Sequence, residues 1–265
     1  MERIETLDDP RVAPYRNLRD RTLRGQNLFI AEGRLLVERL LASRFPAQSV
    51  LVAPKWADTF AALAGSRTPV YVADESLLRR IVGFPFHLGV LAVGQRVEAP
   101  ALDRFLAGFG ARERIALVVC PEMTKADNLG LVFRSAAAMG IDGAVLGERS
   151  CDALSRRALR LSMGATLWLP FTRSARIADD LIRVKRQWSI ELVAAVLEPS
   201  ARRLGDFTWP RRAALVLGNE TEGIRPEWLD ACDHRVTIPM QPPVDSLNVG
   251  VAAGILMDHW RRATA

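Results

Sequence analysis

The segment IALVVCPEMTKADNLGLVFRSAAAMG, residues 115–140, decides the fold that we predict for this chain. Its first six residues are apolar at every position, which is typical of a strand with both faces covered. The following residues repeat apolar side chains at the spacing of one helix face, at Leu129, Val132, Phe133 and Ala136. Asp127 or Asn128 is suited to begin this helix and Gly140 to end it. The segment therefore predicts a buried strand that leads into an amphipathic helix.

Short apolar runs of the same kind recur downstream: GAVLG (143–147), ELVAAVL (191–197), AALVLGNE (213–220) and RVTIPM (235–240). Strands that are apolar at every position form parallel sheets whose two faces are covered by helices. We therefore predict an α/β domain over residues 114–265. In such a domain a ligand is expected at the loops that follow the carboxyl ends of the strands.

A second, smaller α/β domain is predicted over residues 1–95, joined by a linker at residues 96–113. The stretch NLFIAEGRLLVERLLAS (27–43) carries a helical stripe at Leu35, Leu36, Leu40 and Leu41. Strand-like runs follow it: QSVLVAP (48–54), TPVYVA (68–73) and LGVLAVG (88–94). Neither domain contains an internal repeat.

Charge and cysteine usage narrow the class of protein. The 265 residues carry a net charge of +6, which favours a polyanionic partner and nucleic acid in particular. Cys120, Cys151 and Cys232 lie far apart without a CxxC pair, which argues against a disulfide framework and a structural zinc site. The first 20 residues are too charged for a signal peptide, and no apolar run has membrane-spanning length. We therefore expect a soluble cytoplasmic protein.

The stretch AALVLGNETEGI, residues 213–224, is the first candidate wall of a site. A buried strand stops at Gly218, and a polar loop with Asn219, Glu220 and Glu222 follows. Glycine at that point permits positive φ or close approach of a ligand to the backbone. An ordinary turn at a strand end has the same composition, but the position at a carboxyl end favours a site.

The stretch IPMQPPVDSLNVGVAAGIL, residues 238–256, is the second. Its two adjacent prolines fix φ and exclude helix directly before them, so the chain should leave the strand in an extended, stiff conformation. Asp245 or Ser246 is expected to cap a helix that begins near Leu247.

Two glycines lie four residues apart in that last helix, at Gly250 and Gly254. Each glycine costs a helix roughly 1 kcal/mol relative to alanine, so this face should be closely packed. The packing partner is either another part of the chain or a second copy, and the sequence does not choose between them.

Arg134 lies off the apolar stripe of the helix that follows the first strand. It is either a solvated surface arginine or, together with Asn128 near the start of the same helix, part of one cleft. Because no GxGxxG follows the strand, a dinucleotide site of the Rossmann type has little support.

Three motifs in this order resemble the SpoU, or TrmH-like, RNA ribose 2′-O-methyltransferases of the SPOUT class: NLGLVFRSAAAMG (128–140), LVLGNETEGI (215–224) and IPMQPPVDSLNVGVAAGIL (238–256). GQNLFIAEGRLLVERLLAS (25–43) and FHLGVLAVG (86–94) also look like that family's N-terminal substrate-binding domain. The resemblance implies an α/β fold: a C-terminal parallel-sheet, trefoil-knotted methyltransferase domain preceded by a smaller α/β RNA-binding domain. The knot would lie across GNETEG and the IPM joint.

The resemblance further implies S-adenosylmethionine as cofactor and no metal. On the matching positions, the residues that would bind the cofactor are Gly218, Asn219, Ile238, Met240 and Leu247. Those that would form the catalytic surface are Asn128, Arg134, Glu220, Ser246 and Asn248.

Arg134 is the residue that the resemblance implies for activating the ribose hydroxyl. A guanidinium is far too weak an acid to serve easily as a base. Our hypothesis is that Arg134 clamps the adjacent phosphate and stabilises the developing alkoxide. Glu220, Ser246 and Asn248 would orient it.

The partner that the resemblance implies is RNA, with ribosomal RNA favoured over tRNA because of the additional N-terminal domain. Arginines suited to phosphate contacts are Arg16, Arg19, Arg21, Arg24, Arg156, Arg157 and Arg160. Such arginines are equally compatible with a solvated surface. The family also implies a homodimer through the C-terminal domain, with the substrate site shared between subunits.

The sequence gives less support to two other classes of protein. A non-catalytic RNA-binding protein with the knotted fold would be expected to lose catalytic-surface residues, and all are present. A metabolic enzyme on a doubly wound sheet lacks support, because neither a phosphate-binding glycine loop nor a nucleophile elbow occurs.

The chain departs from the pattern of the family it resembles at two places. It has Pro242 and Pro243 where the family usually has glycine soon after IPM, and Gly250 where serine is common. The prolines would alter how the loop closes over the cofactor.

Overall fold

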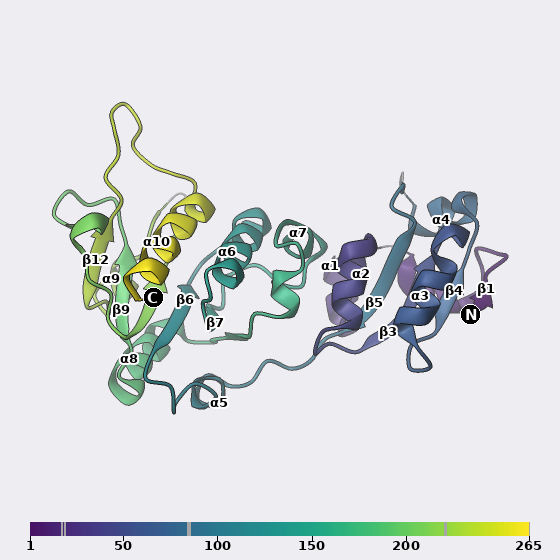
Figure 1. Cartoon of the computed structure of the whole chain (residues 1–265), viewed down its shortest axis with the longest axis horizontal. Helices are drawn as coiled ribbons and strands as arrows, with labels where there is room; N and C mark the ends of the chain where they lie inside the picture. Colours follow the sequence, from purple (N-terminus) through teal and green to yellow (C-terminus); the bar gives the residue numbers. More distant parts are fainter. Residues whose placement is uncertain (17, 19, 84–85, 220–221, 265) are drawn as a thin grey trace. The chain divides into compact units, whose positions relative to one another are not determined.

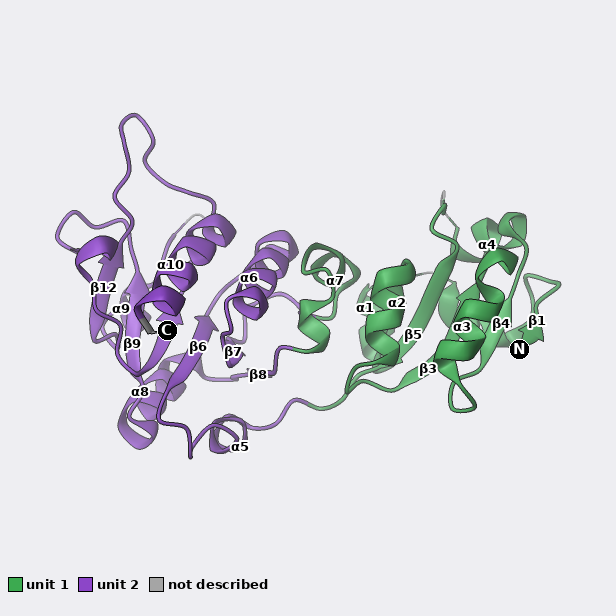
Figure 2. Ribbon diagram, in the orientation of Figure 1, with its two compact units in different colours: residues 1–98, 154–168 green, residues 99–153, 169–265 purple. Residues whose placement is uncertain are grey.

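The computed structural model describes residues 1–16, 18, 20–83, 86–219 and 222–264. The chain forms two compact units, one of residues 1–98 with 154–168 and the other of residues 99–153 with 169–265 (Figure 2). The sequence placed all of residues 114–265 in one domain, whereas residues 154–168 pack with the N-terminal unit.

The N-terminal unit is built on a mixed sheet (Figure 1). Its strands lie in the order β1 (Glu2–Arg3), β4 (Val70–Val72), β3 (Ala47–Val52), β5 (Val90–Gln95) and β2 (Leu28–Glu32). The first three are parallel to one another, and β5 runs antiparallel to both β3 and β2. The helices of this unit are α1 (Asp20–Gly25), α2 (Arg34–Leu41), α3 (Ala57–Ala64), α4 (Glu75–Val82) and α7 (Arg156–Leu161), with 3₁₀ turns at Pro10–Tyr15, Pro54–Trp56 and Ala165–Leu167.

The expected helix in residues 27–43 is in fact a strand followed by a helix. Gly33 separates β2 from α2 and adopts a φ of 93°, which lets the chain change direction there. Leu36 and Leu40 are buried as predicted, but Leu35 is 37% exposed and Val37 takes its place in the core. The stripe begins later because the apolar residues before Gly33 belong to the sheet.

Helix α7 connects residues 154–168 to the N-terminal unit. Ser155 caps it by accepting a hydrogen bond from the Ala158 amide at 3.3 Å. Ala158 and Leu159 are fully buried, and α7 packs against β2. The Arg156 Nη2 lies 2.7 Å from Glu32 Oε2 at the end of that strand. Burial and this ion pair together explain why a segment far along the chain belongs to this unit.

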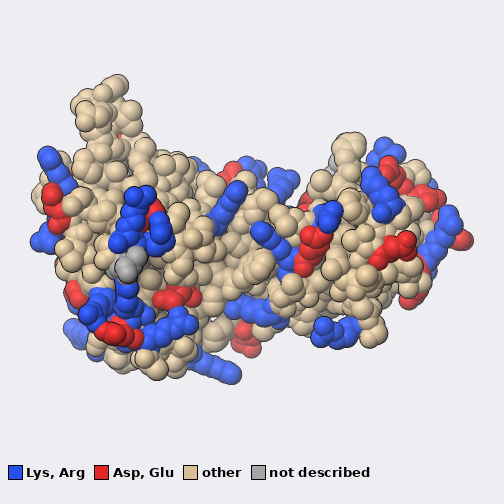
Figure 3. Space-filling view, in the orientation of Figure 1, with Lys and Arg blue, Asp and Glu red and all other residues tan. Residues whose placement is uncertain are grey.

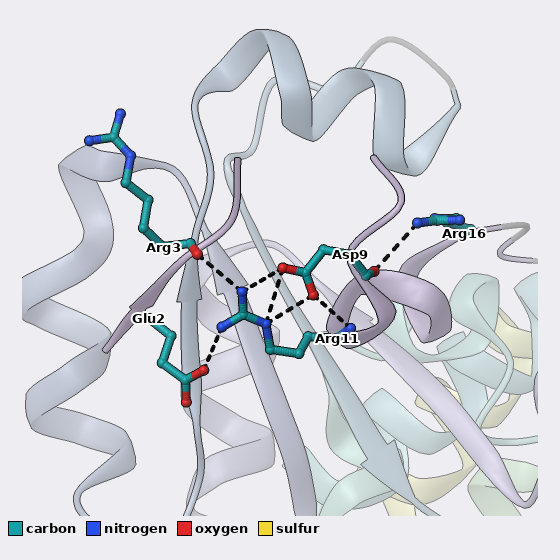
Figure 4. Close-up of polar contacts among 5 residues, drawn as sticks. All are labelled: Glu2, Arg3, Asp9, Arg11 and Arg16. Atoms are coloured by element: carbon teal, nitrogen blue, oxygen red, sulfur yellow. Dashed lines mark hydrogen bonds and ion pairs between the residues drawn. The ribbon is translucent and has the colours of Figure 1, made fainter. Parts of the chain in front are cut away.

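The N-terminus is fixed by a cluster around Arg11 (Figure 4). Its backbone amide and its guanidinium both donate to the Asp9 carboxylate, and the guanidinium also bonds to Glu2. The hydrogen bonds that the Asp9 carboxylate accepts from the Arg11 guanidinium and the Arg11 amide lower the pKa of Asp9 to about 2. Arg16 donates to the Asp9 carbonyl at 3.4 Å.

The second unit contains an all-parallel sheet, as predicted. Its strands lie in the order β10 (Arg202–Arg203), β12 (His234–Thr237), β9 (Glu191–Ala195), β11 (Arg212–Val216), β6 (Ile115–Cys120), β7 (Gly143–Leu146) and β8 (Phe171–Arg173). Its helices are α5 (Leu102–Ala107), α6 (Ala126–Ala138), α8 (Ile177–Trp188), α9 (Pro226–Leu229) and α10 (Val249–Thr264), with a 3₁₀ turn at Leu204–Asp206. The apolar strands are buried on both faces, which is why the sequence signal was continuous.

The predicted linker contains a packed helix. In α5, Leu102, Phe105 and Leu106 are all at most 5% exposed and join the core beneath β6 and α8. The segment therefore contributes to the second unit rather than spanning open solvent.

The order of the strands in the sheet of the second unit determines where the candidate site lies. β11 lies between β9 and β6, and β12 follows beyond β9, so the carboxyl ends of these strands are neighbours. α10, which follows β12, packs against α6, which follows β6 (Figure 1). The threading of the chain into a knot stays a prediction. Among the described residues, no helix has the length and apolar character needed to cross a membrane.

Candidate active site

A cleft of about 990 Å³ opens at the carboxyl ends of these strands. Its walls come from three places: the start of α6, the turn after β11, and the joint between β12 and α10. The loop after β9 adds Val196, Leu197 and Glu198. Apolar side chains line most of it, together with a few amides and carboxylates, the Ser246 hydroxyl and the Lys125 ammonium, as is common in ligand sites.

The start of α6 forms the first wall. The helix begins at Ala126, earlier than the predicted caps Asp127 and Asn128, both of which therefore lie in its first turn. Asn128 is 4% exposed and lines the cleft, while Leu129 and Phe133 are buried in the core. The predicted stripe is correct, and it turns Asn128 toward the ligand side.

The turn after β11 forms the second wall. A Cβ on Gly218 would lie 2.3 Å from the Gly223 carbonyl carbon, so only glycine fits there. Asn219 and Gly223 exchange backbone hydrogen bonds of 3.0 and 3.2 Å, and Gly223 has a φ of 69°. The Asn219 Oδ1 accepts from the Glu222 amide at 2.6 Å. Glu220, a predicted catalytic residue, lies outside the described residues.

The joint between β12 and α10 forms the third wall. The chain turns at the two prolines, where the Val244 amide donates to the Gln241 carbonyl at 3.1 Å. The predicted caps Asp245 and Ser246 are wrong, because α10 begins at Val249 and Asn248 caps it. The Asn248 Oδ1 accepts from the Gly250 amide at 2.9 Å.

The same Asn248 side chain reaches the first wall. Its Nδ2 donates to the Asn128 Oδ1 at 2.9 Å, so one amide both starts α10 and holds a residue of α6. The two walls of the cleft are thereby joined side chain to side chain.

The glycines of α10 face α6. A Cβ on Gly250 would lie 2.6 Å from the Cβ of Leu131, whereas a Cβ on Gly254 would lie 3.5 Å from the Ser135 Oγ, an ordinary contact. The close packing expected at Gly250 is therefore internal to the chain. A side chain at this position would meet the same overlap with Leu131.

Arg134 does not line the cleft. Its side chain is exposed on α6 and, within the part of the chain that the structure describes, has no ion pair or hydrogen bond. A helix turns by about 100° per residue, so six residues separate Arg134 from Asn128 by roughly 120° around the axis. The expectation that both face one cleft is not met within this chain.

The structure nevertheless gathers most of the predicted residues. Those that line the cleft together are Asn128, Gly218, Asn219, Ile238, Met240, Ser246, Leu247 and Asn248. The sequence reasoning missed Lys125, Asp127 and Glu198, which also line it. Glu198 was recognisable in principle, since it follows the apolar run of β9 at the same sheet edge. The described residues contain no cluster of His, Cys, Asp and Glu that suits a metal ion.

The arginines predicted to bind RNA lie on the N-terminal unit. Arg21 and Arg24 on α1 and Arg157 and Arg160 on α7 are exposed. The two helices meet where the Arg156 amide donates to the Asp20 Oδ1 at 3.2 Å. Arg156 is turned inward to Glu32 and Arg16 bonds to Asp9, while Arg19 lies outside the described residues.

Comparison with known proteins decides the family. Residues 116–258 match the model of the SpoU rRNA Methylase family. The chain belongs to this family. An uncharacterized tRNA/rRNA methyltransferase of Mycobacterium tuberculosis is 36% identical to it over 257 residues, which cover 94% of this chain and 87% of that protein.

Two further similarities extend the comparison. The 23S rRNA (guanosine-2′-O-)-methyltransferase RlmB of Acinetobacter baylyi is 29% identical over 191 residues, or 71% of this SpoU family chain and 76% of RlmB. The crystal structure of the SpoU methyltransferase AviRb of Streptomyces viridochromogenes with its cofactor AdoMet has a TM-score of 0.81 and 25% identity, covering 97% of this chain and 99% of AviRb. The family predicted from the three motifs is thus confirmed, and with it the class of RNA methyltransferase.

Proposed function

We propose that this SpoU family chain transfers the methyl group of S-adenosylmethionine to a ribose 2′-hydroxyl in RNA, and in ribosomal RNA rather than tRNA. The observation that carries the proposal is the convergence of eight motif residues, from three separate segments, on one cleft of about 990 Å³. Ribosomal RNA is favoured by the similarity to RlmB and by the additional N-terminal unit.

The cleft fits S-adenosylmethionine chemically. Because Gly218 has no Cβ, the backbone of Gly223 packs directly against it, and both glycines line the cleft. Apolar side chains such as Ile238, Met240 and Leu247 suit an adenine ring, and the carboxylates of Asp127 and Glu198 suit a ligand with ammonium and sulfonium charges. When bound, the cofactor supplies a methyl group on a positively charged sulfur.

The chain's own part in the reaction is to position the ribose and to stabilise the oxygen as it loses its proton. Asn128 and Asn248 are held rigidly by their mutual hydrogen bond, so they present fixed amide groups to the reacting end of the cleft. Ser246 lies beside them on the same wall. We assign Arg134 to the RNA phosphate and to the developing alkoxide.

RNA would be held by the exposed arginines of α1 and α7. Figure 3 shows Lys and Arg side chains distributed over the visible face and interleaved with acidic ones, so no single basic patch dominates that view. We propose RNA contacts on α1 and α7 because these helices are adjacent and their arginines are exposed, and not because of overall charge. The arginines are Arg21, Arg24, Arg157 and Arg160. Phosphate contacts of this kind position RNA without reading its sequence.

A homodimer is part of the proposal. Val251 and Ile255 lie four residues apart on α10 and are 50% and 40% exposed. An apolar stripe at this spacing on a surface helix is suited to pack against a second helix. The position of Arg134 outside its own cleft agrees with a site that a second copy completes.

Isothermal titration calorimetry with S-adenosylmethionine tests the cofactor assignment. We expect saturable binding at one site per chain, competed by S-adenosylhomocysteine. Absence of binding by the folded protein would favour an RNA-binding protein without catalysis.

A further inference from the structure

A buried carboxylate lies behind the cleft, outside its lining. Glu122, in the loop between β6 and α6, is 8% exposed, although a lone ionised carboxylate is rarely buried without partners. Its partner is Arg225, which directly follows the turn that forms the second wall. Neither Glu122 nor Arg225 belongs to the three sequence motifs at residues 128–140, 215–224 and 238–256.

Arg225 binds Glu122 through one hydrogen bond and one ion-pair contact. Its Nη2 donates to Glu122 Oε1 at 3.1 Å, while its Nε lies 2.7 Å from Glu122 Oε2 without forming a hydrogen bond. Contacts to both carboxylate oxygens restrict the orientation of the guanidinium. Arg225 also lies over the Trp228 ring, 5.5 Å from its centroid, which limits its movement on the other side. Arg149 adds a longer ion pair of 3.5 Å to Glu122.

The loop after β7 fixes the backbone on both sides of Glu122. Ser150 Oγ donates to the Cys120 carbonyl at 2.7 Å and accepts from the Met123 amide at 2.9 Å, so it brackets Glu122. Arg173 in turn donates to the carbonyls of Gly147 and Ser150 at 2.7 and 2.8 Å. These hydrogen bonds fix the backbone that carries the Glu122 side chain.

The two residues of this ion pair are close in sequence to two different walls of the cleft. Glu122 precedes Lys125 and Asn128 on the first wall, and Arg225 follows Gly223 and Ile224 on the second. We propose that Glu122 is a positioning residue: through Arg225 it holds the turn of Asn219 and Gly223 against the start of α6, and so keeps the cleft shaped for S-adenosylmethionine. The proposal rests on the cofactor assignment made above.

Two variants test the role. Glu122→Gln removes the charge in nearly the same volume, and Arg225→Lys keeps the charge but removes the guanidinium and its Nη2 hydrogen bond to Glu122 Oε1. We expect each to weaken S-adenosylmethionine binding roughly tenfold in calorimetry, because the binding-competent form of the turn becomes a minor population. The KM for the cofactor should rise with it, while kcat at saturating cofactor stays within about twofold, since no reacting group is removed.

The N-terminal unit offers a matched control. Glu32 and Arg156 form an ion pair of 2.7 Å with side chains 12% and 24% exposed, close to the 11% and 29% of Glu122 and Arg225. Glu32→Gln should reduce stability and leave the affinity for S-adenosylmethionine unchanged. If it weakens binding as much as Glu122→Gln does, a general loss of stability explains both and the positioning role is wrong.

A measurement without ligand keeps the test independent of activity. In Glu122→Gln the amide hydrogens of Asn219 and Gly223, which close the turn, should exchange faster by NMR, while those in the middle of α6 keep their protection. Unchanged exchange and unchanged affinity in both variants would overturn the inference. If the unaltered protein fails to bind S-adenosylmethionine but the exchange prediction holds, the cofactor assignment fails and the structural link stands.

Discussion

Asn248 Nδ2 donates to Asn128 Oδ1 at 2.9 Å, and this hydrogen bond joins the first turn of α6 to the start of α10. The same amide caps α10 through its Oδ1, so neither end of it is free to rotate. Two residues separated by 120 positions along the chain thus act as one unit at the edge of the cleft.

Asn248→Asp separates these two tasks. Aspartate still caps a helix but offers no donor to the buried Asn128 Oδ1, so the free energy of unfolding should fall by about 1–3 kcal/mol. We expect kcat to fall roughly 10- to 100-fold because Asn128 loses its orientation and faces a carboxylate. Asn248→Ala should lose both functions and cost about 1 kcal/mol more in unfolding. Full activity of Asn248→Asp in a methyl-transfer assay would contradict this role.

The two glycines of α10 should respond to alanine in opposite directions. Gly250→Ala places a Cβ against Leu131 and should reduce the free energy of unfolding by about 1–3 kcal/mol. Gly254→Ala meets only an ordinary contact and should raise it by about 0.5–1 kcal/mol, because alanine loses less entropy in a helix.

Urea unfolding measures both variants. Adding Leu131→Ala to Gly250→Ala should recover little of the loss, because alanine keeps the Leu131 Cβ that the new methyl group meets. Equal destabilisation at the two glycines would show that α10 does not approach α6 as closely as described.

Arg134→Lys tests the assignment of Arg134 to the RNA. We expect the methyl-transfer rate to fall at least about 100-fold, because a lysine cannot reproduce the two-pronged contact with phosphate and alkoxide oxygens. The affinity for S-adenosylmethionine should not change, since Arg134 does not line the cleft. Near-normal transfer by Arg134→Lys would refute the geometric role.

The exposed arginines of α7 should contribute to RNA affinity through phosphate. Arg157→Gln and Arg160→Gln should each weaken binding and lower the slope of log affinity against log salt by about 0.7–1. Arg186→Gln on the exposed side of α8 is the control and should change neither. Salt slopes identical in all variants would exclude α7 from the RNA interface.

The apolar stripe of α10 predicts the oligomeric state. Val251→Glu should convert a dimer to monomers in sedimentation velocity, because a carboxylate in an apolar interface is costly. Val97 is 49% exposed against 50% for Val251, so Val97→Glu is a matched control that should stay dimeric. A monomeric unaltered protein would contradict the proposed assembly.

The sequence predicted the parallel sheet because strands buried on both faces leave a continuous apolar signal. It missed β8 and β10, which are short edge strands with exposed arginines and therefore carry no such signal. It also missed that residues 154–168 pack on the N-terminal unit, because the contacts of Ala158 and Leu159 with β2 join distant parts of the chain.

The site was predictable where a backbone feature requires one residue type. Gly218 is such a case, since a side chain there would overlap Gly223. Arg225 and Glu122 were not predictable, because a carboxylate and an arginine about a hundred positions apart look like ordinary surface residues until the sheet order brings them together.

The most direct test of the central claim is a map of ribose methylation in total RNA. Cells that lack this protein should lose one 2′-O-methyl mark in ribosomal RNA, the unaltered protein should restore it, and Asn248→Asp should not. A mark lost only from tRNA would contradict the choice of substrate. An unchanged map of every RNA would contradict the assignment of this cleft to ribose methylation.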